Sequence, residues 1–155
     1  MRVGAFSLLL LATTAACSGR TRPETAATPN AAQYLTPYGP PTRPFSPAVR
    51  VGNMLYLSGQ IGTADATSGS VVPGGIEPET RQAMENIKDV LQRSGSSMDR
   101  VVKCTVMLAD MREWDRMNVV YATYFPTNKP ARSAIGANGL ALGARVEIEC
   151  WATVG

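Results

Sequence analysis

The residues best suited to chemistry lie in the C-terminal quarter of the sequence. Lys129-Pro130-Ala131-Arg132-Ser133 is followed, after Gly143, by Val146-Glu147-Ile148-Glu149. An arginine on a short extended segment after a proline presents a rigid, planar guanidinium that can bind a carboxylate through two hydrogen bonds. A glutamate on the polar side of the last strand could meet it in a cleft and orient or deprotonate a water molecule. The simpler alternative is a structural ion pair between Arg132 and a strand glutamate.

Several residue types are missing, and their absence narrows the chemistry. The 155 residues include no histidine, which excludes a Ser-His-Asp triad, a Cys-His pair and a His-ligated zinc. The three cysteines, Cys17, Cys104 and Cys150, form no CxxC pair, so the sequence predicts no metal site. A net charge of +3 without a run of Lys or Arg argues against a nucleic acid partner.

The elements that must position these residues form a pattern of one α+β domain from residue 44 to residue 155. Apolar residues make up 45% of the chain, enough for one core. Periodicity predicts strands at 48–51, 54–61, 101–108, 132–137 and 145–154, and helices at 77–93 and about 111–125. The order β-β-α-β-α-β, with a short extra strand at Arg132, implies a single sheet with two helices on one face. The other face carries Lys103, Glu147, Glu149 and Trp151, which fits a subunit interface with wet clefts.

Four further side chains are expected to be structural. Cys104 and Cys150 fall on core-facing strand positions, where buried free thiols are the expected state. A disulfide between them is the alternative if their strands are neighbours and the compartment is oxidising. Trp114 and Tyr121 lie on the apolar stripe of the second predicted helix, so we expect both in the core.

The N-terminal part of the sequence is typical of an exported protein. Residues 1–17 contain a positive start, an apolar run from Val3 to Ala16 and then Cys17, which fits a signal peptide with the lipobox of a bacterial lipoprotein. The alternative is an ordinary signal peptide cut after Ala16. Residues 18–43 are rich in Pro, Thr and Ala, so we expect a tether without regular elements. The predicted location is a membrane-anchored, periplasmic lipoprotein, or a soluble periplasmic or secreted protein.

Several of these segments together resemble the RidA/YjgF family of reactive-imine deaminases. The resemblance covers residues 44–154 in order. It rests on Pro130-Ala131-Arg132-Ser133 with Val146-Glu147-Ile148-Glu149, and on four upstream segments: 51–61 (VGNMLYLSGQI), 79–86 (ETRQAMEN), 101–106 (VVKCTV) and 117–125 (MNVVYATYF).

This resemblance implies a fold, an assembly and an activity. The expected fold is chorismate-mutase-like, and the expected assembly is a homotrimer with ligand clefts between subunits. The implied reaction is hydrolysis of 2-imino acids, or their enamine tautomers, to 2-keto acids and ammonia, without metal or organic cofactor. The implied carboxylate-binding residue is Arg132, and the implied water-positioning acid is Glu147. Ser58, Gly59 and Asn118 are implied to line the cleft.

The sequence departs from the family pattern at Phe45. The family often has a tyrosine at this position, so Phe45 keeps the ring of a substrate-binding residue and lacks its hydroxyl. The departure favours a second hypothesis, a non-catalytic trimeric lipoprotein that holds a small carboxylate or a partner protein in the same cleft. Retention of both Arg132 and Glu147 favours the enzyme, because binding alone needs only the arginine.

Overall fold

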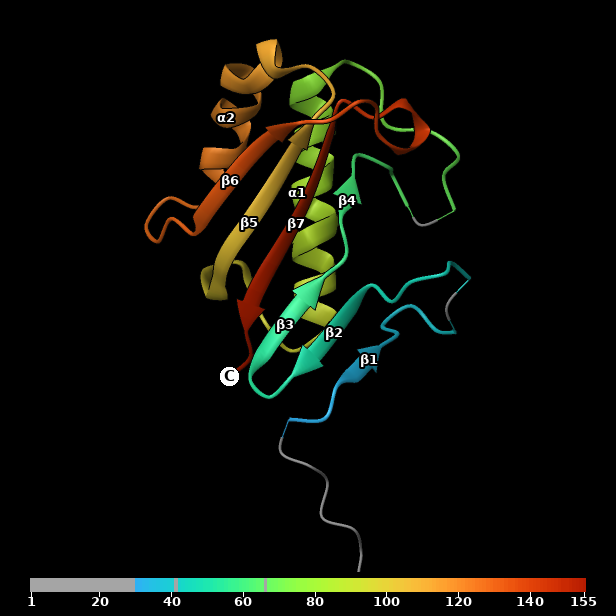
Figure 1. Cartoon of the computed structure of the whole chain (residues 1–155), viewed down its shortest axis with the longest axis vertical. Helices are drawn as coiled ribbons and strands as arrows, with labels where there is room; N and C mark the ends of the chain where they lie inside the picture. The colour runs from blue at the N-terminus through green and yellow to red at the C-terminus, as the bar shows by residue number, and fades with distance from the viewer. Residues whose placement is uncertain (1–29, 41, 66) are drawn as a thin grey trace, which may run out of the picture.

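The computed structural model describes residues 30–155 apart from 41 and 66 (Figure 1). The predicted export signal at 1–17, including the lipidation site Cys17, and the first part of the predicted tether lie outside the described residues. Within the described part, no helix is both long enough and apolar enough to cross a membrane.

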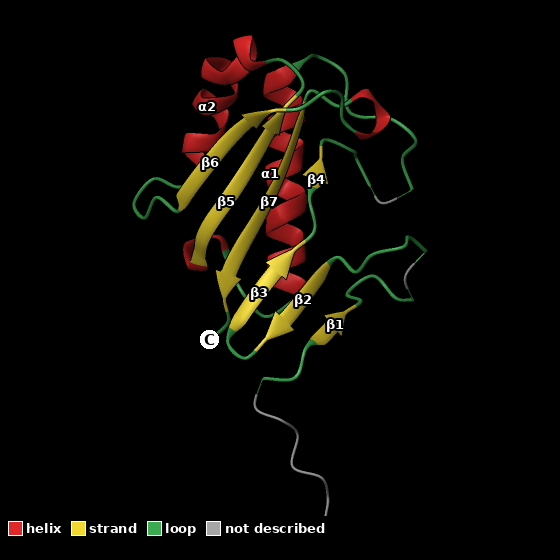
Figure 2. Cartoon of the chain, in the orientation of Figure 1, coloured by secondary structure: helices red, strands yellow, loops and turns green. Residues whose placement is uncertain are grey.

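One seven-stranded sheet carries two helices on one of its faces (Figures 1 and 2). The strands are β1 (Gln33–Leu35), β2 (Ala48–Val51), β3 (Met54–Leu57), β4 (Gln60–Ile61), β5 (Val101–Leu108), β6 (Ala131–Gly136) and β7 (Val146–Thr153), and the helices are α1 (Ile76–Arg93) and α2 (Trp114–Thr123). The strand order is β1-β2-β3-β7-β5-β6, and β4 also pairs with β7. Only the pairing of β5 with β6 is parallel among these described strands. The predicted α+β class is confirmed.

The core lies between the sheet and the helices. Every second residue of β7, namely Val146, Ile148, Cys150 and Ala152, is buried, which is the pattern of a strand with one covered face. The buried residues of α1 recur at helical spacing and include Ala83, Ile87, Val90 and Leu91. Each fully buried Val, Leu or Ile side chain among them contributes roughly 1.5–3 kcal/mol. A one-residue slip of β7 would expose all four of its buried residues, so the core also fixes the face on which Glu147 lies.

The expectation of free thiols at Cys104 and Cys150 is wrong, because the two cysteines form a disulfide. They are direct partners in the antiparallel pairing of β5 with β7, and their Cα atoms are 4.1 Å apart. Periodicity placed both on the core-facing side but could not say that these two strands are neighbours. The sequence order of the strands differs from their order in the sheet.

We expect this disulfide to stabilise the domain by roughly 4 kcal/mol, because it closes a loop of 46 residues in the unfolded chain. In urea titrations, wild type should unfold at a lower midpoint when a reductant is present during unfolding. The double variant Cys104→Ala/Cys150→Ala should unfold at a midpoint that reductant does not change. Equal midpoints for wild type with and without reductant would contradict a structural role for the bond.

Four local features differ from the sequence predictions. β1 lies within the predicted tether and pairs with β2, so this part of the tether is a regular strand. The predicted strand 54–61 is interrupted at Ser58 and Gly59, between β3 and β4. A register shift between Val101 and Lys103 turns Val102 outward, where it is 43% exposed. Trp114 is 40% exposed at the start of α2, not in the core.

Candidate active site

Arg132 lies at the edge of the sheet, beneath α2. It is the second residue of the edge strand β6, and its register partner on β5 is the core-facing Cys104, so the Arg132 side chain lies on the helix-covered face. One guanidinium nitrogen donates a hydrogen bond of 2.7 Å to the side-chain oxygen of Asn118 on α2. The guanidinium carbon lies 4.8 Å from the ring centroid of Tyr121, also on α2. Two contacts from α2 therefore fix the orientation of the Arg132 guanidinium.

Tyr121 is a site residue that the sequence analysis placed only in the core. It is indeed buried, with 7% of its surface exposed, but its ring also stacks against the guanidinium of Arg132. Its hydroxyl has no hydrogen-bond partner, and burial raises the pKa of Tyr121 to about 12 against the opposing charge of Arg132. One feature of the sequence could have indicated this role. Tyr121 follows Asn118 by three residues, a spacing that places both side chains on the same side of α2.

Glu147 lies on the opposite face of the sheet. It is adjacent in β7 to the buried Val146 and Ile148, and its register partners are Ile61 on β4 and Met107 on β5. Its carboxylate lies against the backbone of Gly59: a Cβ atom added to Gly59 would be 2.9 Å from the carboxyl carbon of Glu147. A side chain at this position would force the Glu147 carboxylate to shift, so Gly59, at the break between β3 and β4, allows the carboxylate to approach the backbone this closely.

Ser58 joins this second group of residues. Its hydroxyl donates a hydrogen bond of 2.7 Å to the carbonyl of Ser46, and its amide donates one of 3.0 Å to the carbonyl of Pro47. These bonds tie the segment before β2 to the break between β3 and β4. The structure therefore brings Ser58, Gly59 and Glu147 close together.

The surroundings of Glu147 favour the protonated form of its carboxyl group, compared with a glutamate that is fully exposed to water. Burial of the carboxyl, followed by the negative charge of Glu149 on the same face, raises the pKa of Glu147 above its ordinary value. A carboxylate with a raised pKa is a better proton acceptor near neutral pH than an ordinary glutamate.

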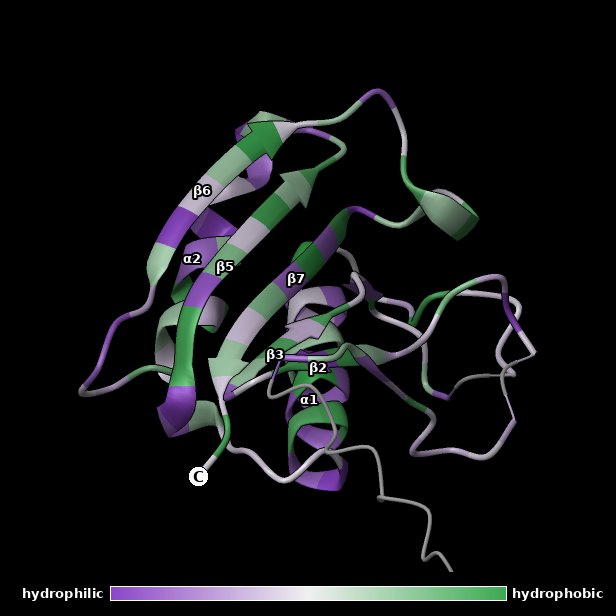
Figure 3. Ribbon diagram, turned by 60° about the horizontal axis from the view of Figure 1, so that its bottom comes forward, coloured by the Kyte–Doolittle hydropathy of each residue, from purple (hydrophilic) through white to green (hydrophobic). Residues whose placement is uncertain are grey.

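Arg132 and Glu147 do not meet within one chain. They lie on two strands that flank β5 and on opposite faces of the sheet, and both strands carry hydrophilic stretches (purple in Figure 3). The simple ion pair that sequence spacing allowed is therefore not formed in this chain. Arg132 with Asn118 forms one half of the candidate site, and Ser58, Gly59 and Glu147 form the other half.

Phe45 directly precedes Ser46, whose carbonyl accepts the hydrogen bond from the Ser58 hydroxyl, so it lies on the segment that is tied to the break between β3 and β4. It is 47% exposed and lines a cavity of about 750 Å³ between the segment 38–47 and α1, with Tyr38, Gln60 and Asn86 among the other lining residues. Arg43 lies with its guanidinium carbon 6.0 Å from the Phe45 ring centroid. Among the described residues, no three His, Cys, Asp or Glu side chains are grouped so that they could hold a metal ion.

Comparison with known proteins assigns the chain to a family. It matches the family described as Endoribonuclease L-PSP over residues 37–154. It is 45% identical over 112 residues to the 2-iminobutanoate/2-iminopropanoate deaminase of Mus musculus, covering 72% of this chain and 82% of that protein. It is similar to the crystal structure of yeast Mmf1, with a TM-score of 0.70, 38% identity and coverage of 83% of this chain and 98% of that one. It is also similar to E. coli TdcF with bound serine, with a TM-score of 0.69, 27% identity and coverage of 79% and 98%. The chain therefore belongs to the Endoribonuclease L-PSP family, which includes the RidA/YjgF proteins that its sequence resembles.

Proposed function

We propose that the protein hydrolyses reactive 2-imino acids, or their enamine tautomers, to 2-keto acids and ammonia. The observation that carries the proposal is that the chain holds two groups suited to this reaction: the Arg132 guanidinium, which Asn118 and Tyr121 hold in place, and the partly buried carboxylate of Glu147, whose pKa is raised. The name of the mouse relative supports the substrate class. The serine bound to TdcF supports a site that accepts a small amino acid with a free carboxylate.

The proposed reaction needs only a substrate held in the correct position and one group that accepts a proton. Arg132 binds the substrate carboxylate through two hydrogen bonds and holds the imine carbon near Glu147. The Glu147 carboxylate accepts a proton from water as the water oxygen forms a bond to the imine carbon, and the imine nitrogen takes up a proton. The resulting carbinolamine then passes its hydroxyl proton, through Glu147 or water, to its nitrogen, and the C–N bond breaks to release ammonia and the 2-keto acid. Wild type should accelerate ammonia release from 2-iminobutanoate or 2-iminopropanoate generated in the assay.

We propose further that the complete site lies between subunits of a homotrimer. Because the two halves lie on opposite faces of one sheet, a second copy must supply the missing half. The uncovered sheet face offers an apolar contact: Tyr56 and Trp151 are 38% and 41% exposed, and their ring centroids are 5.1 Å apart.

Light scattering of the purified protein should give the mass of three chains. A monomer at micromolar concentration would contradict the inter-subunit site.

We also propose that the protein is exported and anchored by a lipid at Cys17. The apolar run Val3 to Ala16 before Cys17 supports this location, and so does the disulfide between Cys104 and Cys150, since such bonds persist mainly in oxidising compartments. Cys17→Ser should move the protein from the membrane fraction to the soluble fraction. Mass spectrometry should find a lipid-modified cysteine at the mature N-terminus of wild type. An unmodified N-terminus would contradict the anchor.

A further inference from the structure

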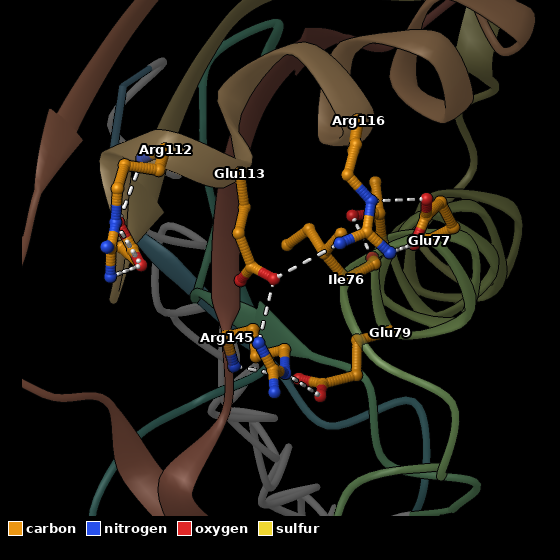
Figure 4. Close-up of polar contacts among 9 residues, drawn as sticks. Ile76, Glu77, Glu79, Arg112, Glu113, Arg116 and Arg145 are labelled. Carbon is orange, nitrogen blue, oxygen red and sulfur yellow. Dashed lines mark hydrogen bonds and ion pairs between the residues drawn. The ribbon is translucent and has the colours of Figure 1, made fainter.

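A buried carboxylate outside both halves of the site holds the start of β7. Glu79, in the first turn of α1, is only 4% exposed, which is unusual for a glutamate. One of its carboxylate oxygens accepts a hydrogen bond of 2.8 Å from the backbone N–H of Arg145, and the other lies 3.9 Å from the guanidinium of Arg145. Glu113, just before α2, accepts a hydrogen bond of 2.7 Å from the same guanidinium (Figure 4). We call these three residues the Glu79 junction.

The Glu79 junction lies beside both strands that position Glu147. Arg145 immediately precedes β7, and its carbonyl accepts a hydrogen bond of 3.0 Å from the amide of Ala109, which follows β5. On the other side, the backbone of Glu79 lies against Gly62, where an added Cβ would be 2.8 Å from the Cα of Glu79. Gly62 follows Ile61, the β4 partner of Glu147. The first turn of α1 therefore fixes the chain next to both Glu147 and its partner strand.

Stability alone is a weak reason for charges at this position. Removing a carboxylate from water is costly, and apolar replacements of buried ion pairs are often neutral or stabilising. A neighbouring pair shows what an ordinary surface contact looks like here: Glu77 and Arg116 meet at 2.6 Å on the same corner, with side chains 37% and 57% exposed, and Arg116 also lies 3.7 Å from Glu113.

We propose that Glu79 is a positioning residue for Glu147, acting through Arg145 with Glu113 as the second support. The proposal rests on the proposed function for its effect on turnover. Loss of the Glu79 carboxylate frees the N–H of Arg145 and lets the start of β7 move away from β4. Glu147 then becomes better hydrated and loses its fixed distance from the attacking water. Arg132 is unaffected, because it lies on another strand and on the other face.

The test compares Glu79→Ala and Glu79→Gln with Glu77→Ala, a matched control from the same helical turn. Glu79→Ala should lower kcat roughly tenfold, as expected for a small misplacement of a reacting group, and leave KM nearly unchanged. Glu79→Gln keeps an oxygen for the N–H of Arg145 and should restore most of the turnover. Glu77→Ala should leave kcat at the wild-type value.

A second readout does not depend on turnover. NMR titration of the Glu147 carboxyl should give a lower midpoint in Glu79→Ala than in wild type, because hydration removes part of the burial that raises the pKa of Glu147. An unchanged midpoint in Glu79→Ala would overturn the positioning role, even if wild type hydrolyses no imine and the proposed function fails. An equal loss of kcat in Glu77→Ala would also overturn it. If Glu79→Ala does not fold, Glu79→Leu replaces it, because leucine fills the space of the side chain but offers no acceptor to the N–H of Arg145. A wild-type Glu147 midpoint in that variant would be equally contrary.

Discussion

Replacing Arg132 with alanine should lower kcat/KM for imine hydrolysis at least a hundredfold, a loss on the order of 3 kcal/mol. The variant removes the guanidinium that binds the substrate carboxylate through two charge-assisted hydrogen bonds. It also frees Asn118 and Tyr121 from the contacts that now orient the guanidinium. Steady-state kinetics with 2-iminobutanoate measures the effect directly.

Two further variants separate recognition from a general effect of charge. Arg132→Lys should restore little, because an ammonium group offers a point charge and cannot form two parallel hydrogen bonds. Arg112→Ala is the matched control: Arg112 is an exposed arginine paired with Asp110 at 2.6 Å, outside both halves of the site. It should leave kcat/KM at the wild-type value. Wild-type activity in Arg132→Ala would show that the deaminase assignment at this site is wrong.

Replacing Glu147 with glutamine should lower kcat by roughly 10²- to 10⁴-fold, the range expected for a lost general base. Glutamine keeps the shape of the side chain and one hydrogen-bonding oxygen, so binding of a 2-keto acid product should change little. The expected signature is therefore a loss in kcat with a nearly constant inhibition constant for 2-keto acids. A variant that loses binding and keeps its turnover number would place Glu147 in substrate recognition instead.

The same residue should set the acid side of the pH profile. The active form of Glu147 is the carboxylate, so turnover should fall as the pH drops through the pKa of Glu147. Because that pKa is raised by burial and by Glu149, turnover should be lost at a higher pH than an ordinary glutamate would give. Glu149→Gln removes the second contribution, so the acid limb should move to lower pH and stay above the ordinary value for glutamate.

Sequence patterns predicted the parts of the fold that depend on local periodicity. β5 has its predicted bounds, and α1 begins one residue earlier than predicted, because alternation and helical spacing are properties of contiguous residues. The order of strands in the sheet is not local, and the sequence left the neighbours of β5 undetermined. For that reason the disulfide between Cys104 and Cys150 was only the alternative to free thiols, although both residues were placed correctly on the covered face.

For the candidate site as well, the sequence indicated which residues matter but not how they are arranged in space. Arg132 and Glu147 were predicted as functional residues from their types and from family resemblance. That they lie on opposite faces follows only from the register of β5 with β6 and β7. The role of Tyr121 was missed because an aromatic residue on an apolar helix stripe has the same pattern whether or not it also supports a guanidinium. The place of Phe45 in the cleft stays a prediction; in this chain Phe45 lines a cavity against α1 that no periodicity could indicate.

Complementation between two inactive variants tests most directly whether the site is shared between subunits. Arg132→Ala chains and Glu147→Gln chains are mixed in equal amounts, dissociated and reassembled, and imine hydrolysis is measured before and after. In random trimers about one quarter of the clefts combine an intact Arg132 from one chain with an intact Glu147 from its neighbour. We therefore predict that the mixture regains about a quarter of wild-type activity, while each variant treated alone regains none. No recovery in trimers shown to contain both chains would contradict a site built from two subunits.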